Sequence, residues 1–245
     1  MGAILYMAHQ VGFFFILFSG VAGLFIPTCS GIGKSYFGLY ILWRLRLCCG
    51  TDTSVVWYAA NERLIFHPDG RVSHCSFDPV EYIYNPSNWL LIDAHPPPQA
   101  VARTILLTSP QRERFKEFSR TDNVRMVCMP LWDMQELLDL HKSEFTQLAR
   151  ARVLELCTLW GPVPRSVLTH ASNMIFQEQQ EALITALPEQ SFNEFIKRMG
   201  DTTYPYGLIS GTVIHMHPNE SYTFSRPRFA SDRIANRFID NLILK

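Results

Sequence analysis

A lysine and a serine close a short glycine-containing segment, SGIGKS, at residues 30–35. An apolar stretch, Leu24–Pro27, precedes this segment, and apolar residues recur at helical spacing over 36–46 after it. Glycine accepts positive φ, so a loop between a strand and a helix can turn several backbone N–H groups toward one anion. The N-terminus of the following helix favours negative charge at the same place. The segment 24–46 therefore predicts a phosphate-binding loop.

The residue types in this loop suit a nucleotide bound together with magnesium. Lys34 is expected to reach the β- and γ-phosphates, and the Ser35 hydroxyl to bind Mg²⁺. The pattern G-x-x-x-x-G-K-[ST] would require glycine where this chain has Thr28. An ordinary glycine-containing turn before a helix is the alternative. The residues expected to contact the nucleotide are Ser30, Gly31, Ile32, Gly33, Lys34, Ser35 and Tyr36.

A second candidate site residue ends the segment WLLID, Trp89–Asp93. Four large apolar residues are typical of a fully buried parallel strand, and parallel sheets bind ligands beyond the carboxyl ends of their strands. Asp93 is therefore expected to hold Mg²⁺, which bridges phosphate oxygens. An aspartate that only begins a turn before three prolines is the alternative. Ala94 and His95 follow and offer no second carboxylate to orient water, so we expect slow hydrolysis.

The segment TILLTS, Thr104–Ser109, predicts another buried strand, placed between the first strand and the strand that ends at Asp93. One of its two terminal hydroxyls, on Ser109 or Thr108, is the candidate to touch the γ-phosphate or the attacking water, and a hydroxyl that ends a strand by chance is the alternative. Asp69-Gly70 predicts the turn of an inserted β-hairpin. Together these segments predict an α/β core with a mostly parallel sheet over residues 24–130.

Residues 131–245 change to helical patterns and predict a mainly helical lid and C-terminal subdomain. The turn WGPVPR at 160–165 breaks one helix and fixes the start of the next, because each proline lacks an N–H group. Arg165 is the candidate lid contact to a phosphate, with a surface arginine as the alternative. Later, segments 206–215 and 222–224 predict a strand hairpin, and 231–244 predicts an amphipathic helix.

Residues 1–23 contain no Lys, Arg, Asp or Glu. Three interpretations stay open for this apolar N-terminal extension: a gene-boundary artefact or buried extension, a secretory signal without a positive n-region, and a short membrane span. A membrane span is the least favoured, since inserting it would draw the adjoining strand out of the sheet.

Composition limits the remaining function classes. A formal net charge of zero gives no indication of direct nucleic-acid binding. The six cysteines form no C-x-x-C pair and have no zinc-ligand spacing with histidine, so buried reduced thiols in an intracellular protein of the cytoplasm or nucleus are expected.

Several segments in fixed order carry a family resemblance: SGIGKSYFGLYILWRL, WLLIDAHPP, ILLTSPQRERFKEFSR, MPLWDMQELL and LWGPVPRSVL. With SYTFSRPRFASDRIANRFIDNLI near the end, they resemble the NTPase module of the Crinkler effectors and the related retrotransposon hot spot proteins, over Leu24 to Lys245. The resemblance implies a STAND-like or AAA-like P-loop NTPase. Lys34, Ser35 and Asp93 would then bind the Mg-nucleotide, and Arg165 would contact it from the lid. For effector members it implies secretion into a host cell.

Two functions follow from these features. The first is a P-loop NTPase that binds ATP or GTP with Mg²⁺ and couples slow hydrolysis to lid movement. The second is a non-hydrolysing interaction module that nucleotide stabilises, with a protein partner or a second copy bound through the helical part.

Overall fold

The computed structural model describes residues 22–27, 29–48, 52–59, 62–109, 115–186, 212–223 and 225–243. The chain divides into two compact units, which we describe separately. The sheet unit contains the first strand, up to residue 28, and Gly33–Met129. The helical unit contains Cys29–Ile32 and Pro130–Lys245. The apolar residues 1–21 and Thr28 lie outside the described residues.

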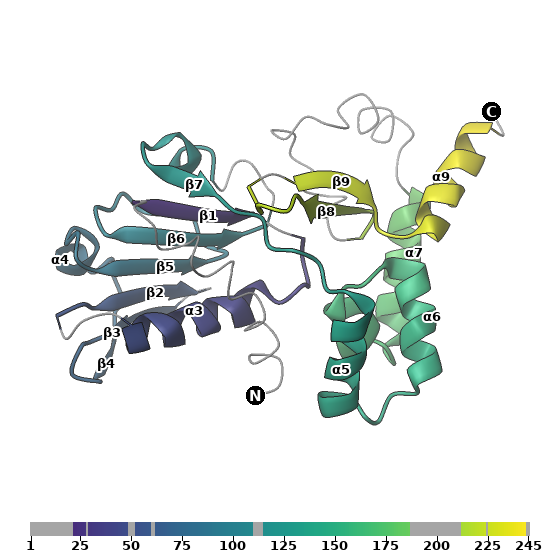
Figure 1. The fold of residues 1–245 in the computed structure, drawn as a ribbon, viewed down its shortest axis with the longest axis horizontal. Helices are drawn as coiled ribbons and strands as arrows, with labels where there is room; N and C mark the ends of the chain where they lie inside the picture. The colour runs from purple at the N-terminus through teal and green to yellow at the C-terminus, as the bar shows by residue number, and fades with distance from the viewer. Residues whose placement is uncertain are drawn as a thin grey trace. The chain divides into compact units, whose positions relative to one another are not determined.

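Seven strands form one mixed sheet in the sheet unit, in the order β4-β3-β2-β5-β6-β1-β7 (Figure 1). The pairs β7–β1, β1–β6, β6–β5 and β5–β2 are parallel, whereas β3 and β4 add an antiparallel hairpin to the edge. The mostly parallel sheet with an inserted hairpin is confirmed. The strands are β1 Gly23–Pro27, β2 Val55–Ala59, β3 Glu62–Phe66, β4 Val72–His74, β5 Trp89–Asp93, β6 Arg103–Thr108 and β7 Val124–Met126.

The two faces of the sheet bury different residues of the same strands. Side chains alternate along a strand, so Leu90 and Ile92 of β5 point to one face and Leu91 and Asp93 to the other. On the first face Leu90 and Ile92 join an apolar cluster that includes Tyr58 and the helix α4, Val80–Ile83. Phe115 packs against this cluster, and a single 3-10 turn, η3, follows at Phe118–Arg120.

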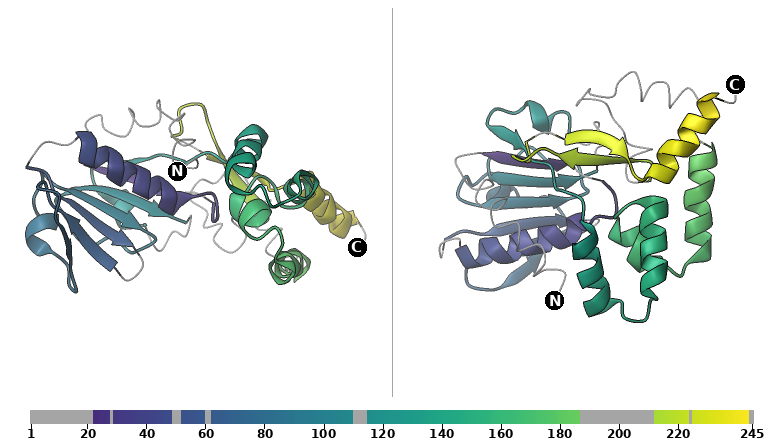
Figure 2. Two further views of the ribbon diagram at one scale, coloured as in Figure 1. Left: turned by 90° about the horizontal axis from the view of Figure 1, so that it is seen from below. Right: turned by 45° about the vertical axis from the view of Figure 1, so that its right-hand side comes forward.

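The second face of the sheet is covered by α3, Lys34–Cys48 (Figure 2, left). A Cβ at Gly38 would lie 2.7 Å from Leu107 Cδ1 and 2.8 Å from Trp57 Cη2, so only glycine allows the helix this close to the sheet. At the other end of the helix, Arg46 Nη1 donates to the His67 carbonyl. His67 follows β3 at the amino edge of β2, so α3 begins near the carboxyl ends of the parallel strands.

The helical unit contains four α-helices, a π-helical turn and one hairpin among its described residues. Its first helix has a capping box, in which Asp133 accepts from Glu136 N and the Glu136 carboxylate accepts from Asp133 N. The predicted antiparallel hairpin is present, but its second strand begins at Ser225, after the predicted 222–224; residues 206–211 of its predicted first strand lie outside the described residues. The elements are α5 Met134–Glu144, α6 Arg150–Trp160, η4 Arg165–Thr169, α7 Met174–Ala186, β8 Ile214–Pro218, β9 Ser225–Phe229 and α9 Asp232–Ile243.

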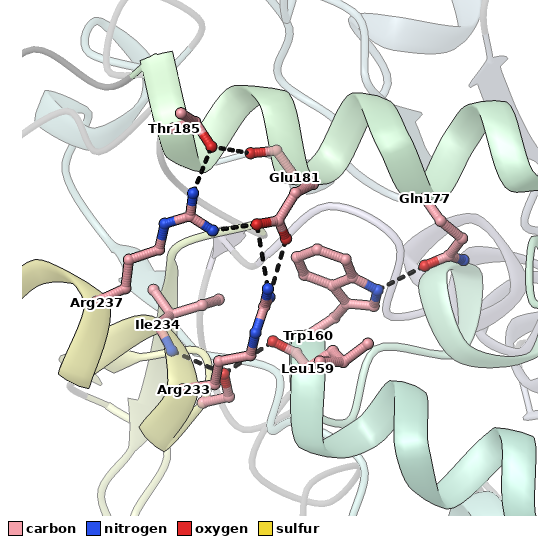
Figure 3. A network of polar contacts seen from close by, with 9 residues as sticks. Leu159, Trp160, Gln177, Glu181, Thr185, Arg233, Ile234 and Arg237 are labelled. Atoms are coloured by element: carbon pink, nitrogen blue, oxygen red, sulfur yellow. Dashed lines mark hydrogen bonds and ion pairs between the residues drawn. The ribbon is translucent and has the colours of Figure 1, made fainter.

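Polar contacts connect α6, α7 and α9 (Figure 3). Trp160 Nε1 donates to Gln177 Oε1 at 2.5 Å. The Glu181 carboxylate pairs with Arg233 at 2.9 Å and also with Arg237, and the Arg233 guanidinium lies 5.6 Å from the centre of the Trp160 ring. No helix within the described residues is long and apolar enough to cross a membrane.

Candidate functional site

The glycine-containing loop has the backbone conformation that its sequence predicts. Gly31 has φ 85° and Gly33 has φ 103°, values that other residues adopt only with strain. The Gly33 carbonyl accepts the first backbone hydrogen bond of α3, from Phe37 N at 2.9 Å. The N–H groups of the first helical turn have no partner within a helix, so the loop ends in donors that point along the helix axis.

Lys34 and Ser35 occupy the first turn of α3, at the carboxyl edge of the parallel strands. Gly38 packs on Leu107, the second-last residue of β6. Lys34 precedes Gly38 by one turn, about 6 Å along the axis, so it lies further toward that edge. Ser35 is exposed and Lys34 is half-buried. Tyr36 is 60% exposed on the outward side of the helix.

Asp93 is the last residue of β5 and is only 8% exposed. It pairs in register with Leu107, the residue against which α3 packs, so its carboxylate lies on the α3 face of the sheet. Among the described residues, none donates a hydrogen bond to this carboxylate or forms an ion pair with it. A carboxylate whose oxygens have no described partner is available to bind a metal ion.

The backbone turns sharply directly after Asp93. Ala94 has φ 54°, a left-handed conformation that costs a residue with a Cβ about 1–2 kcal/mol. Its N–H donates to the Leu107 carbonyl at 2.9 Å, which extends the β5–β6 ladder by one bond beyond Asp93. Strain of this kind concentrates at functional sites, where the surrounding structure holds it.

Strand β6 lies between β1 and β5, as the sequence predicts for the strand that ends near Ser109. Adjacent strands are about 4.8 Å apart, so the ends of β1 and β5 are separated by roughly 10 Å. Thr108 is buried, and its hydroxyl donates to the Ser109 carbonyl at 3.1 Å. Continued by one residue, the alternation of β6 places Ser109 on the same face as Asp93, and Thr108 on the opposite face.

His95 is directed away from Asp93. Its ring meets the Tyr58 ring edge-on at 5.7 Å, and its Nδ1 lies 2.7 Å from the Pro96 carbonyl oxygen. Tyr58 belongs to the apolar cluster on the face opposite α3, and its hydroxyl donates to Asp78 Oδ1 at 3.0 Å. Burial, followed by the contact with Asp78, raises the pKa of Tyr58 above its ordinary value. His95 is therefore poorly placed to orient a water beside Asp93.

The first half of the loop is held by the helical unit. Trp132 Nε1 donates to the Ile32 carbonyl at 2.8 Å, and Met216 N donates to Cys29 Sγ at 3.2 Å. Arg165 holds the loop twice, since its backbone N donates to the Gly31 carbonyl at 3.3 Å and its Nη1 to Ser30 Oγ at 3.2 Å. A Cβ at Gly31 would lie 2.9 Å from Arg165 Cβ, so close packing adds to the need for glycine.

The candidate residues thus form two groups. The sheet unit brings Lys34, Ser35, Asp93 and Ser109 to one edge and one face of its sheet, and the helical unit joins Ser30, Gly31 and Ile32 to Arg165. No cluster of three or more His, Cys, Asp or Glu side chains that could hold a metal ion occurs among the described residues. The loop contacts of Trp132 and Cys29 are absent from the sequence-based prediction. Their only signal is the position of Trp132 within MPLWD.

The structure defines a mixed α/β protein with a mostly parallel sheet and a glycine-containing loop at the carboxyl edge of that sheet. The chain is distantly similar to two proteins of Phytophthora infestans, Crinkler effector protein 15 at 27% identity and Crinkler effector protein 16 at 26%. Each alignment covers 84% of this chain and 34% of the relative, so the chain spans about a third of the length of these curated relatives. No family model matches the sequence. No solved structure matches the fold.

Proposed function

We propose that this chain binds a nucleoside triphosphate, ATP or GTP, together with Mg²⁺, as the P-loop module of an effector-type protein. The Asp93 carboxylate carries the proposal. It lies at the end of a central parallel strand, on the face where α3 begins, and no described group neutralises it. A divalent cation would supply the missing charge, and Mg²⁺ prefers carboxylate, hydroxyl and phosphate oxygens.

The residues take separate roles in this proposal. Lys34 pairs with the β- and γ-phosphates, while Ser35 and Asp93 hold Mg²⁺ directly or through water. The N–H groups of the loop and of the first turn of α3 bind the phosphate oxygens. Ser109 contacts the γ-phosphate or orients the attacking water. When bound, Mg²⁺ supplies charge neutralisation of the phosphates during transfer.

Two further observations support the proposal. The strand β6 separates the loop strand β1 from the Asp93 strand β5, which leaves roughly 10 Å between the two strand ends for a phosphate chain and its metal. The similarity to Crinkler effector proteins supports an effector-type role. We propose separately that the helical part binds a protein partner or a second copy of the chain.

Nucleotide binding by the full chain, measured calorimetrically with ATP and GTP at fixed Mg²⁺, tests the proposal. Lys34→Ala is expected to weaken binding by at least about tenfold, because a hydrogen bond to a charged group contributes about 1.5–3 kcal/mol. Asp93→Asn is nearly isosteric and is expected to remove the dependence of affinity on Mg²⁺. Lys142→Ala, on α5 of the helical unit, is the matched charge control and should bind as wild type does. Wild-type protein that binds neither nucleotide, or a Lys34→Ala variant that binds normally, would overturn the proposal.

We propose slow hydrolysis as the first outcome and binding without hydrolysis as the second candidate function. The position of His95 against Tyr58 favours the second, because it leaves no described acid or base beside Asp93 to activate water. In hydrolysis a water oxygen attacks the γ-phosphorus and the bond to the β–γ bridging oxygen breaks. Phosphate release at saturating Mg-nucleotide separates the two candidates: slow release that Ser109→Ala lowers further indicates an NTPase, and binding with no release above buffer indicates an interaction module.

A further inference from the structure

Three groups of the helical unit contact the backbone carbonyls or the thiol of residues 29–32. The indole of Trp132, which is 8% exposed, donates to the Ile32 carbonyl, and the backbone N of Arg165 donates to the Gly31 carbonyl. Cys29 is fully buried and accepts from Met216 N. The loop is therefore held at three residues, Cys29, Gly31 and Ile32.

Because the peptide group is planar, each contact to a carbonyl also fixes the direction of the next N–H bond. In a trans peptide the C=O bond and the next N–H bond point to opposite sides. The Ile32 carbonyl points to Trp132, so the N–H of Gly33 points away from Trp132. The Gly31 carbonyl points to Arg165 N, so the N–H of Ile32 points away from Arg165. Within the described part of the chain, neither of these two N–H groups has an acceptor, and buried or loop donors of this kind form anion-binding nests.

We propose that Trp132 is a positioning residue of the phosphate loop: it holds the Ile32–Gly33 peptide so that the Gly33 N–H faces the phosphate chain of the bound nucleotide. This inference depends on the proposed function and adds the control of loop geometry by the helical unit. Arg165 acts in the same way through its backbone N, and its guanidinium holds Ser30 Oγ. A change in the Trp132 contact therefore alters phosphate binding without any contact between the indole and the nucleotide.

Two matched variants of the full chain test the proposal. Trp132→Phe keeps a large ring but removes the N–H donor to the loop, and Trp160→Phe removes an equivalent buried donor, whose acceptor is Gln177 Oε1, away from the loop. Trp132→Phe is expected to weaken Mg-nucleotide binding about fivefold, the effect of one hydrogen bond. Trp160→Phe is expected to lower the melting temperature while nucleotide affinity stays within about twofold of wild type. Tripolyphosphate, which has no base or ribose, should show the same fivefold loss with Trp132→Phe.

The following results test the role of Trp132. Equal nucleotide affinities for the two variants would overturn the role of Trp132, even if Lys34→Ala abolishes binding and so supports the proposed function. A loss with Trp132→Phe for the nucleotide but not for tripolyphosphate would also overturn it. If Trp132→Phe fails to fold, amide NMR of the wild-type protein replaces it: Mg-nucleotide should shift the Ile32 and Gly33 N–H signals and slow their exchange. Unchanged amide signals at saturating nucleotide would overturn the proposal.

Discussion

Both units bury apolar residues, and they differ in how polar contacts join their elements. In the sheet unit, buried strands such as β5 stack apolar residues on both faces, and every residue of β5 is buried. In the helical unit, specific polar contacts between residues far apart in sequence join the helices, as Glu181 does with Arg233 and Arg237 (Figure 3). The free energy of apolar burial is roughly proportional to the area buried and depends little on any one contact, whereas a polar network depends on each of its partners. The two units should therefore respond differently to single substitutions.

The largest expected effect is at Gly161 of the helical unit, at the end of α6. Gly161 has φ 75°, and a Cβ there would lie 2.1 Å from the Ala230 carbonyl oxygen and 2.7 Å from His215 Cε1. Since the clash is with backbone, Gly161→Ala should destabilise the helical unit by about 4 kcal/mol or more, among the largest values for single substitutions. Hydrogen exchange of peptides from α6 and α9, compared with peptides from β5, measures the loss in each unit.

Gly70→Ala is the matched control for this prediction. Gly70 also has positive φ, at 92°, but no atom lies within 4 Å of the added Cβ. Gly70→Ala should therefore lower the free energy of unfolding by only the conformational penalty, about 1–2 kcal/mol. Similar losses for the two glycine variants would contradict the role of close packing at Gly161.

The next largest effect is expected in the core of the sheet unit. Leu91 is fully buried on the α3 face of β5, so Leu91→Ala should lower the free energy of unfolding by about 2–5 kcal/mol. Leu39→Ala, on the outward side of α3 at 45% exposure, should change it by less than about 0.5 kcal/mol. Urea denaturation measures the change in unfolding free energy for both variants. Hydrogen exchange of peptides from β5 and β6 shows where in the protein the stability is lost. A loss that appears in α7 and α9 peptides as strongly as in β5 would contradict the prediction that the effect is confined to the sheet unit.

The sheet unit could be predicted from sequence to a large extent. The strand Trp89–Asp93 has the predicted bounds, and the Asp69-Gly70 turn joins β3 to β4 as predicted. α3 extends over Lys34–Cys48 against a predicted 36–46. These successes follow from physics that is local in sequence: a run of large apolar residues buries both faces of a strand, and glycine permits a tight turn.

The contacts of the candidate site could be predicted only in part. Lys34 and Ser35 could be named as candidates from the loop motif, and Asp93 from its position at the end of a strand. Their roles stay predictions. The hydrogen bond from Trp132 to Ile32 joins residues 100 positions apart. It ends on a backbone carbonyl, which every residue type possesses, so no pattern at position 32 could indicate it.

The helical unit was predicted less well for a related reason. Residues 206–211 of the predicted hairpin lie outside the described residues. Within the described part of the chain, the first strand continues to Pro218 and the second begins at Ser225, later than the predicted 222–224. A short antiparallel pair is positioned by what it packs against, here Cys29 at the β8 backbone, and not by its own weak alternation. The two-proline turn was informative, because η4 begins at Arg165, directly after Pro164.

The smallest predicted effect concerns the ion pairs of Glu181. Its hydrogen bond with Arg233, and secondarily that with Arg237, lowers the pKa of the Glu181 carboxyl. A carboxyl whose pKa is lower in the folded state stabilises the protein above its unfolded pKa of about 4.3, and this contribution is lost as pH falls through the folded pKa. The side chain is 35% exposed, so solvent screening limits the effect of Glu181→Gln to about 1 kcal/mol at pH 7.

The pH dependence separates this ion-pair effect from a simple loss of packing. Glu181→Gln keeps the size of the side chain but replaces one acceptor oxygen by an NH2 donor and has no charge to titrate, so the difference in unfolding free energy from wild type should shrink below about pH 4. Glu155→Gln, in an i,i+3 pair with Arg152 on α6 alone, is the matched control and should have a smaller effect. Thermal unfolding from pH 3 to 7 measures both variants. A Glu181→Gln difference that stays constant over this range would mean that the side chain stabilises α7 and α9 through packing. The polar contacts of the helical unit would then differ from those of the sheet unit in the sequence separation of their partners and not in their charge.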